Sequence, residues 1–214
     1  MMEFLKSSPK WTRKPKEVKI DGQKVIVTTE KGTDLWACTY YGFQNDNAPV
    51  FQIETSEKYF SFVVKTEFES SCRFDQCGVV MYLDSDNWFK ASIEYEDEKI
   101  QRLGSVVTNH GYSDWATTDI SSDIKHMWYR FSRREATIVL KTVKTESTTS
   151  KCGFFICGKA PVKSLMGSTL AVRQRDLIRQ LFPLCRLRIV NGNLTQIGKF
   201  KEDLGGIKCC NLNG

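Results

Sequence analysis

Three side chains that suit the binding of a polar ring recur at even-numbered positions of one short segment. They are Trp88, Lys90 and Glu94, and positions 89, 91 and 93 between them are apolar. Successive side chains of a β-strand point to opposite faces, so these three would share the outer face of a sheet. Trp offers a flat apolar surface, while Lys and Glu offer hydrogen-bond donors and acceptors. That combination matches a sugar, and the segment predicts a ligand-binding face.

A second group with the same chemistry follows within residues 109–115. It adds an amide, a phenol, a carboxylate and a second indole, which would enlarge the site if this loop folds over the same face. Order along the chain is the only basis for that step. The predicted ligand-binding residues are Trp88, Lys90, Glu94, Asn109, Tyr112, Asp114 and Trp115.

Structural interpretations of the same residues stay open. Lys90 and Glu94 could form an ion pair on a solvated sheet surface, where such a pair contributes little to stability. Trp115 could fill the core beneath a loop. Asp84 and Asp86 favour a hairpin turn, because the residue at position twelve counted from Asp84 is not the Glu of an EF-hand calcium loop.

The eight cysteines do not establish a metal site. Cys72 and Cys77 share their spacing with Cys152 and Cys157. Zinc knuckles need tight turns with two to four intervening residues, but Cys157 follows a Phe-Phe-Ile run typical of a strand. We therefore expect free thiols, no bound metal and no cofactor.

A hydrolytic function needs two carboxylates on either side of a glycosidic bond. Glu94, Glu96 and Glu98 alternate and could supply them, but residues 96–99 are all polar and are typical of a turn. Neither His110 nor His126 belongs to a recognisable catalytic motif. Enzymatic activity is therefore not established, and a non-catalytic domain is favoured.

Two-residue alternation through the first three quarters of the chain predicts many half-buried strands joined by short turns. Polar and glycine-containing turn signals lie near residues 84–87, 96–99, 109–111 and 121–123. This pattern indicates an all-β, antiparallel two-sheet sandwich. Strands are expected at 59–68, 78–83, 88–95, 106–107, 127–132 and 136–142.

The last quarter breaks this pattern. Residues 170–182 carry an apolar helical stripe that ends before Pro183, so a helix is expected there. We place a sandwich domain at residues 1–162 and a basic extension at 163–214. Alternatively, the extension supplies a missing strand near residues 186–190.

Charge and hydropathy bear on partners and location. Residues 1–162 contain 22 basic and 22 acidic residues, whereas residues 163–214 contain 9 and 3. A nucleic-acid-binding domain would carry its basic surface on the folded body, so no nucleic acid is expected as a partner. No apolar stretch reaches the ~20 residues of a membrane span, and the first residues lack a secretory signal, so a cytoplasmic location is expected.

Residues 86–95 read Asp-Asn-Trp-x-Lys-x-x-Ile-Glu-Tyr, and residues 109–115 read Asn-x-Gly-Tyr-Ser-Asp-Trp. These runs, with Phe131–Arg134 and Gly153–Cys157, resemble the family of yeast regulation-of-enolase proteins and their bacterial relatives. The resemblance extends from about Trp11 to Pro161 and implies a concanavalin A-like lectin/glucanase fold. It transfers a fold more firmly than a function.

The residues and the resemblance together predict a non-catalytic ligand-binding domain that takes a carbohydrate or another small polar ligand. One alternative is a regulatory module that binds a metabolic enzyme, as the family's name implies. The other is a glycoside hydrolase, because the fold also hosts glucanases.

Overall fold

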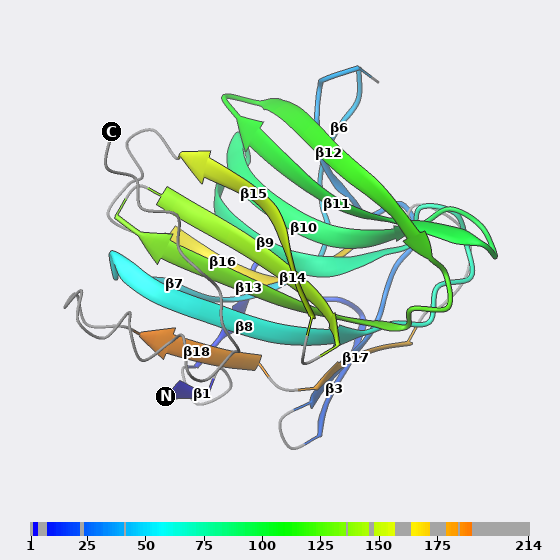
Figure 1. The fold of residues 1–214 in the computed structure, drawn as a ribbon, viewed down its shortest axis with the longest axis horizontal. Helices are drawn as coiled ribbons and strands as arrows, with labels where there is room; N and C mark the ends of the chain where they lie inside the picture. The colour runs from blue at the N-terminus through cyan, green and yellow to red at the C-terminus, as the bar shows by residue number, and fades with distance from the viewer. Residues whose placement is uncertain are drawn as a thin grey trace.

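A computed structural model describes residues 2–3, 8–21, 24–40, 42–135, 137–145, 148–156, 164–171, 179–183 and 185–189. The described residues form antiparallel β-sheets, and the long strands of two of them run side by side across the molecule in Figure 1. This confirms the expected all-β sandwich of the concanavalin A-like kind.

The first sheet has the order β15-β14-β13-β8-β17-β4-β3, and β18 pairs with both β8 and β1. Its strands are β1 (Met2–Glu3), β3 (Glu17–Asp21), β4 (Lys24–Thr28), β8 (Tyr59–Glu67), β13 (His126–Arg134), β14 (Thr137–Thr145), β15 (Thr148–Ile156), β17 (Arg179–Pro183) and β18 (Cys185–Ile189).

The second sheet has the order β12-β11-β10-β9-β16-β7-β2. Its strands are β2 (Lys10–Trp11), β7 (Val50–Thr55), β9 (Gln76–Asp84), β10 (Asn87–Tyr95), β11 (Ile100–Asn109), β12 (Tyr112–Ser121) and β16 (Ser164–Ala171). A separate hairpin consists of β5 (Leu35–Ala37) and β6 (Gln44–Asp46).

The main core lies between the two large sheets. Phe60, Phe62 and Val64 alternate along β8, and Phe89 and Ile93 alternate along β10, all buried in one cluster. Full burial of each large apolar side chain contributes roughly 1.5–3 kcal/mol, so these alternating positions hold the sheets face to face. The expected sidedness of both segments is therefore confirmed.

A second, smaller core lies on the other face of the second sheet. The segment that carries β5 and β6 folds over that face, and Leu35, Trp36 and Ala48 pack there against Val80 and Trp88. Trp88 does point away from the main core, but only 3% of its surface is exposed. The expectation that Trp88 is solvent-exposed was wrong, because the sequence pattern does not reveal that residues 34–50 cover this face.

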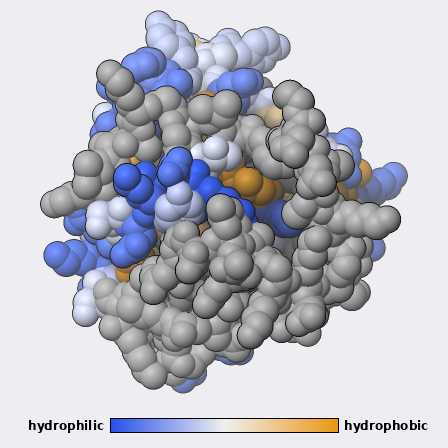
Figure 2. All heavy atoms as spheres, turned by 60° about the vertical axis from the view of Figure 1, so that its left-hand side comes forward, coloured by the Kyte–Doolittle hydropathy of each residue, from blue (hydrophilic) through white to orange (hydrophobic). Residues whose placement is uncertain are grey.

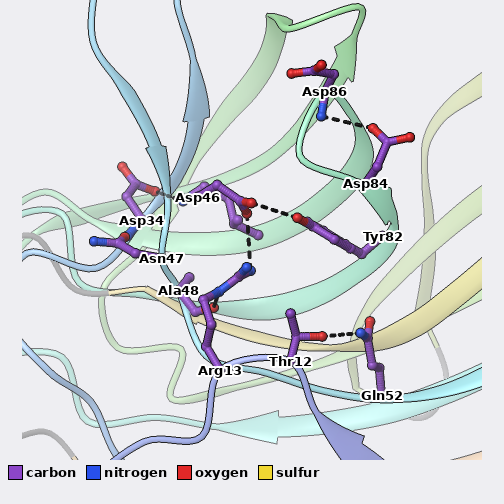
Figure 3. Close-up of polar contacts among 11 residues, drawn as sticks. Thr12, Arg13, Asp34, Asp46, Asn47, Ala48, Gln52, Tyr82, Asp84 and Asp86 are labelled. Atoms are coloured by element: carbon purple, nitrogen blue, oxygen red, sulfur yellow. Dashed lines mark hydrogen bonds and ion pairs between the residues drawn. The ribbon is translucent and has the colours of Figure 1, made fainter.

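Polar contacts fasten the covering segment to the sheet (Figure 3). Tyr82 on β9 donates a hydrogen bond of 2.6 Å to the Asp46 carboxylate, and an Arg13 terminal nitrogen lies 3.2 Å from the same carboxylate. The Nε of Arg13 donates to the carbonyl of Ala48 over 2.6 Å. Burial and the bond to Asp46 raise the pKa of Tyr82 to about 12. We call Arg13, Asp46 and Tyr82 the polar clasp.

The covering hairpin is also tied to the edge of the second sheet. The backbone nitrogen of Ala37 donates to the Ser113 hydroxyl on β12 over 2.9 Å. Within the hairpin it is accordingly β5 that contacts β12. The small hairpin is thus held at both ends, by the polar clasp and by Ser113.

Asp side chains close two hairpins of the second sheet. The Asp84 carboxylate accepts the backbone N–H of Asp86 over 2.9 Å, which confirms the expected turn there. The Asp97 carboxylate accepts the N–H groups of Lys99 and Ile100, at 2.8 and 2.9 Å, and these bonds lower the pKa of Asp97. The expected turn at residues 96–99 therefore fixes how β10 pairs with β11.

The C-terminal segment differs from the expected helix at 170–182. Residues 164–171 and 179–183 are strands β16 and β17, while residues 172–178 lie outside the described part of the chain. β16 pairs with β7 and β9, and β18 pairs with β8, so segments beyond residue 162 supply strands to both sheets. The predicted helix falls mainly on residues 172–178, which are outside the described part of the chain, while the residues on either side of them are paired as strands. The domain boundary at residue 162 stays a prediction.

The surface shown in Figure 2 is mostly hydrophilic where it is described, with hydrophobic atoms in small areas between charged and polar neighbours. No helix in the described ranges has the length and hydropathy that a membrane crossing requires.

Candidate functional site

A cavity of about 220 Å³ opens on the outer face of the second sheet, where the β5–β6 hairpin meets β10, β11 and β12. We call it the outer pocket. Charged groups and aromatic rings share its lining. The residues are Asp34, Trp36, Phe43, Arg73, Phe74, Gln76, Lys90, Ser92, Glu94, Arg102, Gly104, Val106 and Trp115.

A buried ion pair lies at one side of the outer pocket. The Nζ of Lys90 lies 3.1 Å from Asp34 Oδ1 and donates to Gln76 Oε1 over 3.0 Å. Asp34 is held in turn, because its carboxylate accepts the N–H of Leu35 and its own N–H donates to the Asn47 side chain. An ammonium this deeply buried requires such partners, so Lys90 is neutralised within the protein.

Glu94 contributes a carboxyl group with a different environment. The described residues donate no hydrogen bond to it and form no ion pair with it, although Lys90 and Arg102 are near enough to attract its charge. Burial raises the pKa of Glu94, and the nearby Asp34 and Glu96 raise it further, against the opposing effect of Lys90 and Arg102. Glu94 is therefore a half-buried acceptor that a ligand hydroxyl could satisfy.

Two arginines at the pocket share one carboxylate. Glu96 lies 2.5 Å from a terminal nitrogen of Arg73 and 3.2 Å from one of Arg102. Arg73 also lies over the Phe74 ring at 4.7 Å, and Arg102 lies over the Trp115 ring at 5.8 Å. These contacts fix both guanidinium groups at the pocket wall, so each has a carboxylate partner before any ligand arrives.

Aromatic rings from two directions form the apolar part of the pocket. Trp36 from β5 meets Trp115 from β12 edge to face, with ring centroids 6.4 Å apart. Phe43 lies 6.4 Å from Trp36 on the same hairpin. The indole N–H of Trp36 is bound to the carbonyl of Thr39 at 3.0 Å, which orients this ring. The covering hairpin therefore supplies two of the four aromatic rings that line the pocket.

The structure brings together three of the seven predicted ligand-binding residues. Lys90, Glu94 and Trp115 line the outer pocket. Trp88 is buried beneath it, with its ring 5.9 Å from Lys90 Nζ. The remaining three do not line the pocket: Asn109, Tyr112 and Asp114 are exposed near the turn that joins β11 to β12.

Several pocket residues were missed, and only some of them carried a signal. Ser92 lies between Lys90 and Glu94 at another even-numbered position, so the alternation along the strand alone could have predicted it as a pocket residue. Counting across the 96–99 turn would have placed Arg102 opposite Glu94 and Gly104 opposite Ser92, as the register shows. Asp34, 56 residues before Lys90, could not be found this way.

The carboxylates of the pocket differ in how they are paired. Asp34 is bound to Lys90 and Glu96 to two arginines, so of these three only Glu94 lacks a hydrogen-bonded partner among the described residues. The alternative of a Lys90–Glu94 ion pair is not realised, since Lys90 pairs with Asp34. In the part of the chain that is described, no group of three or more metal-binding side chains converges.

The chain matches a family model described as "Protein of unknown function (DUF1349)" over residues 11–167. The chain belongs to this family. The part of the chain that matches DUF1349 includes the polar clasp and every residue of the outer pocket.

Among curated relatives of this DUF1349 chain is "Regulation of enolase protein 1" of Saccharomyces cerevisiae. It is 32% identical over 139 residues, covering 64% of this chain and 68% of that protein. A crystal structure of a functionally unknown protein from Saccharomyces cerevisiae superposes with a TM-score of 0.80 at 27% identity, covering 87% of this chain and 98% of that one.

A more distant structure agrees in fold. The legume lectin-like domain from Entamoeba histolytica superposes with a TM-score of 0.57 at 10% identity, covering 85% of this chain and 90% of that domain. This likeness shows that the DUF1349 chain has a lectin-like sandwich and says nothing more about its ligand.

Proposed function

We propose that this protein binds a small neutral carbohydrate in the outer pocket without transforming it. One observation carries the proposal: aromatic rings and an unsatisfied carboxyl group, Glu94, face the same small cavity. A sugar presents apolar ring faces and hydroxyl edges, which fit those two kinds of surface. The cavity of about 220 Å³ is below the ~300 Å³ lower end for drug-sized ligands, which favours a single ring.

The charge distribution supports binding without catalysis. Glycoside hydrolysis requires one carboxylic acid and one carboxylate placed across the scissile bond. Glu94 could serve as the acid, but Asp34 and Glu96 are both held in ion pairs by Lys90 and the two arginines. The pocket therefore offers one available carboxyl group, which orients a ligand but does not complete a hydrolytic pair.

Tryptophan fluorescence tests the proposal, because Trp36 and Trp115 both line the pocket. We expect saturable changes on titration with neutral monosaccharides, and at least tenfold weaker binding by Glu94→Gln and Trp115→Ala variants. Tyr112→Ala is the matched control, since Tyr112 is 67% exposed and does not line the pocket. Absence of saturable binding to a broad panel of neutral sugars would exclude the proposal.

The name of the 32% identical relative favours a second candidate, a regulatory module that binds a metabolic enzyme. Tyr40 and Tyr112 are 90% and 67% exposed, and both belong to elements joined by the Ala37–Ser113 bond, so they offer a surface apart from the pocket. Immobilised protein should then retain purified enolase, and Tyr40→Ala with Tyr112→Ala should abolish retention while sugar binding persists. Retention that survives both changes would exclude this surface.

A further inference from the structure

Gly104 occupies a position in β11 where a side chain would collide with the pocket wall. A Cβ atom built there would lie 2.8 Å from Nε1 of Trp115 and 3.3 Å from the backbone oxygen of Ala116. Contacts below 3.0 Å are essentially not seen for real Cβ atoms, so the indole could not keep its place over an alanine. The missing side chain is what lets Trp115 lie across β11.

The strand register shows which residues lie beside the indole ring. Gly104 pairs directly with Ser92, and Arg102 pairs with Glu94, on the same face of β10 and β11. Directly paired residues have Cβ atoms about 5 Å apart in an antiparallel sheet. The indole N–H that lies above Gly104 is therefore on the side of Ser92, and Glu94 follows two residues farther along the same face of β10.

These three polar groups share an unusual property. Trp115 Nε1, the Ser92 hydroxyl and the Glu94 carboxyl all line the pocket, and none has a hydrogen-bond partner among the residues that the structure describes. The indole N–H can only donate a hydrogen bond, the Ser92 hydroxyl can donate and accept, and the Glu94 carboxylate can accept. A ligand that displaces solvent from the pocket must satisfy all three groups, because a polar group that it buried without a partner would be costly.

We propose that Gly104 is a specificity-determining residue, and that the three groups it brings together select a neutral ring with two neighbouring hydroxyl groups. This inference rests on the proposed function and deepens it. One ligand hydroxyl donates to Glu94 and accepts from Ser92, while the adjacent hydroxyl accepts from the Trp115 N–H.

The surrounding charges disfavour anionic relatives of such a ligand. Lys90, Arg73 and Arg102 each already have a carboxylate partner, so an anionic ligand would meet Glu94 with no unpaired cation to offset it. A neutral polyhydroxyl ligand avoids this penalty.

Isothermal titration calorimetry on the full chain tests this assignment with glucose and xylose, their monodeoxy analogues and glucuronate. We expect the neutral sugars to bind, and glucuronate, as well as the deoxy analogue that lacks a contacted hydroxyl, to bind at least tenfold more weakly. Gly104→Ala should weaken binding of the neutral sugars at least tenfold. Ser105→Ala is the control, because Ser105 is the next residue of β11 and its side chain points to the opposite face.

The outcomes separate the inference from the proposed function. If the wild type binds neutral sugars and Gly104→Ala binds them equally well, or if glucuronate binds best, the inference is overturned while the proposed function stands. If the wild type binds no member of the panel, both fail. Should Gly104→Ala not fold, Trp115→Phe and Ser92→Ala remove one group each without adding bulk, and unchanged affinity in both would overturn the inference.

Discussion

Asp34 Oδ1 and Lys90 Nζ lie 3.1 Å apart in the interior, although 56 residues separate them in the chain. Both side chains are almost fully buried, at 8% and 4% exposed. Their contact joins the start of the covering hairpin to β10 of the second sheet. Together with the polar clasp and Ser113, this pair holds the hairpin over the sheet beside the outer pocket.

Removal of Lys90 should therefore strongly destabilise the protein. Lys90→Met leaves the buried Asp34 carboxylate without its counter-ion, which typically costs about 3–5 kcal/mol. Urea unfolding followed by circular dichroism measures the loss. Lys16→Met is the matched control, because Lys16 pairs with Glu30 over 2.9 Å at the surface, where solvent screens the pair and it contributes little to stability. Equal effects of the two substitutions would contradict the buried-pair interpretation.

The raised pKa of Glu94 predicts how the stability of the folded protein changes with pH. Burial raises the pKa of Glu94 in the folded state, so folding favours its protonated form. The stability associated with that proton is fully present below the unfolded pKa of about 4.3 and is lost as pH rises through the folded pKa. Glu94→Gln should thus be more stable than the wild type at neutral pH, with the difference vanishing in acid. Denaturant unfolding across the acidic range checks this, and a difference that grows in acid would refute it.

Trp88 should behave as a core residue rather than as a ligand-binding one. It is 3% exposed within the smaller core, so Trp88→Ala is expected to cost about 3–5 kcal/mol in the free energy of unfolding. Tyr112→Ala, at a site 67% exposed, should change stability by less than about 0.5 kcal/mol. Thermal unfolding of both variants distinguishes the two environments, and a fully stable Trp88→Ala protein would contradict the structure.

The polar clasp predicts a loss of stability at high pH. Tyr82 has a pKa of about 12, so its contribution is present below pH ~10 and is lost as pH rises toward 12. Tyr82→Phe should cost about 1–3 kcal/mol at neutral pH, since Asp46 loses a buried donor, and should flatten the alkaline decline. Tyr40→Phe, at an exposed position, serves as control. The decline is followed by unfolding experiments, and an unchanged alkaline profile of Tyr82→Phe would exclude this assignment.

The sequence predicted the sandwich and the sidedness of β8 and β10 because both follow from local alternation. It predicted Lys90 and Glu94 as pocket residues for the same reason. It could not predict that Trp88 is covered, since the covering residues 34–50 lie far away in the chain and their contact with β10 depends on tertiary packing. The sequence also did not predict that residues 170–171 and 179–182 pair as strands, because such pairing depends on partners far away in the chain.

Residues 109–114 show where chemical type alone is insufficient. Asn109, Tyr112 and Asp114 have side chains as suitable for a ligand as those of the pocket, yet they are exposed near the end of the β11–β12 hairpin. Trp115 reaches the pocket only because Gly104 leaves room for its ring. The distinction depends on a contact between neighbouring strands that spacing along one strand does not reveal.

The short turn fixed by Asp97 has a consequence for how this pocket could change between related proteins. Its two backbone bonds set the alignment that places Arg102 and Gly104 opposite Glu94 and Ser92. A single insertion there that slipped β11 by one residue would turn Arg102 and Gly104 toward the interior and present Leu103 and Ser105 to the ligand instead. A one-residue insertion or deletion in this loop could thus change which side chains face the ligand without any substitution of a pocket residue.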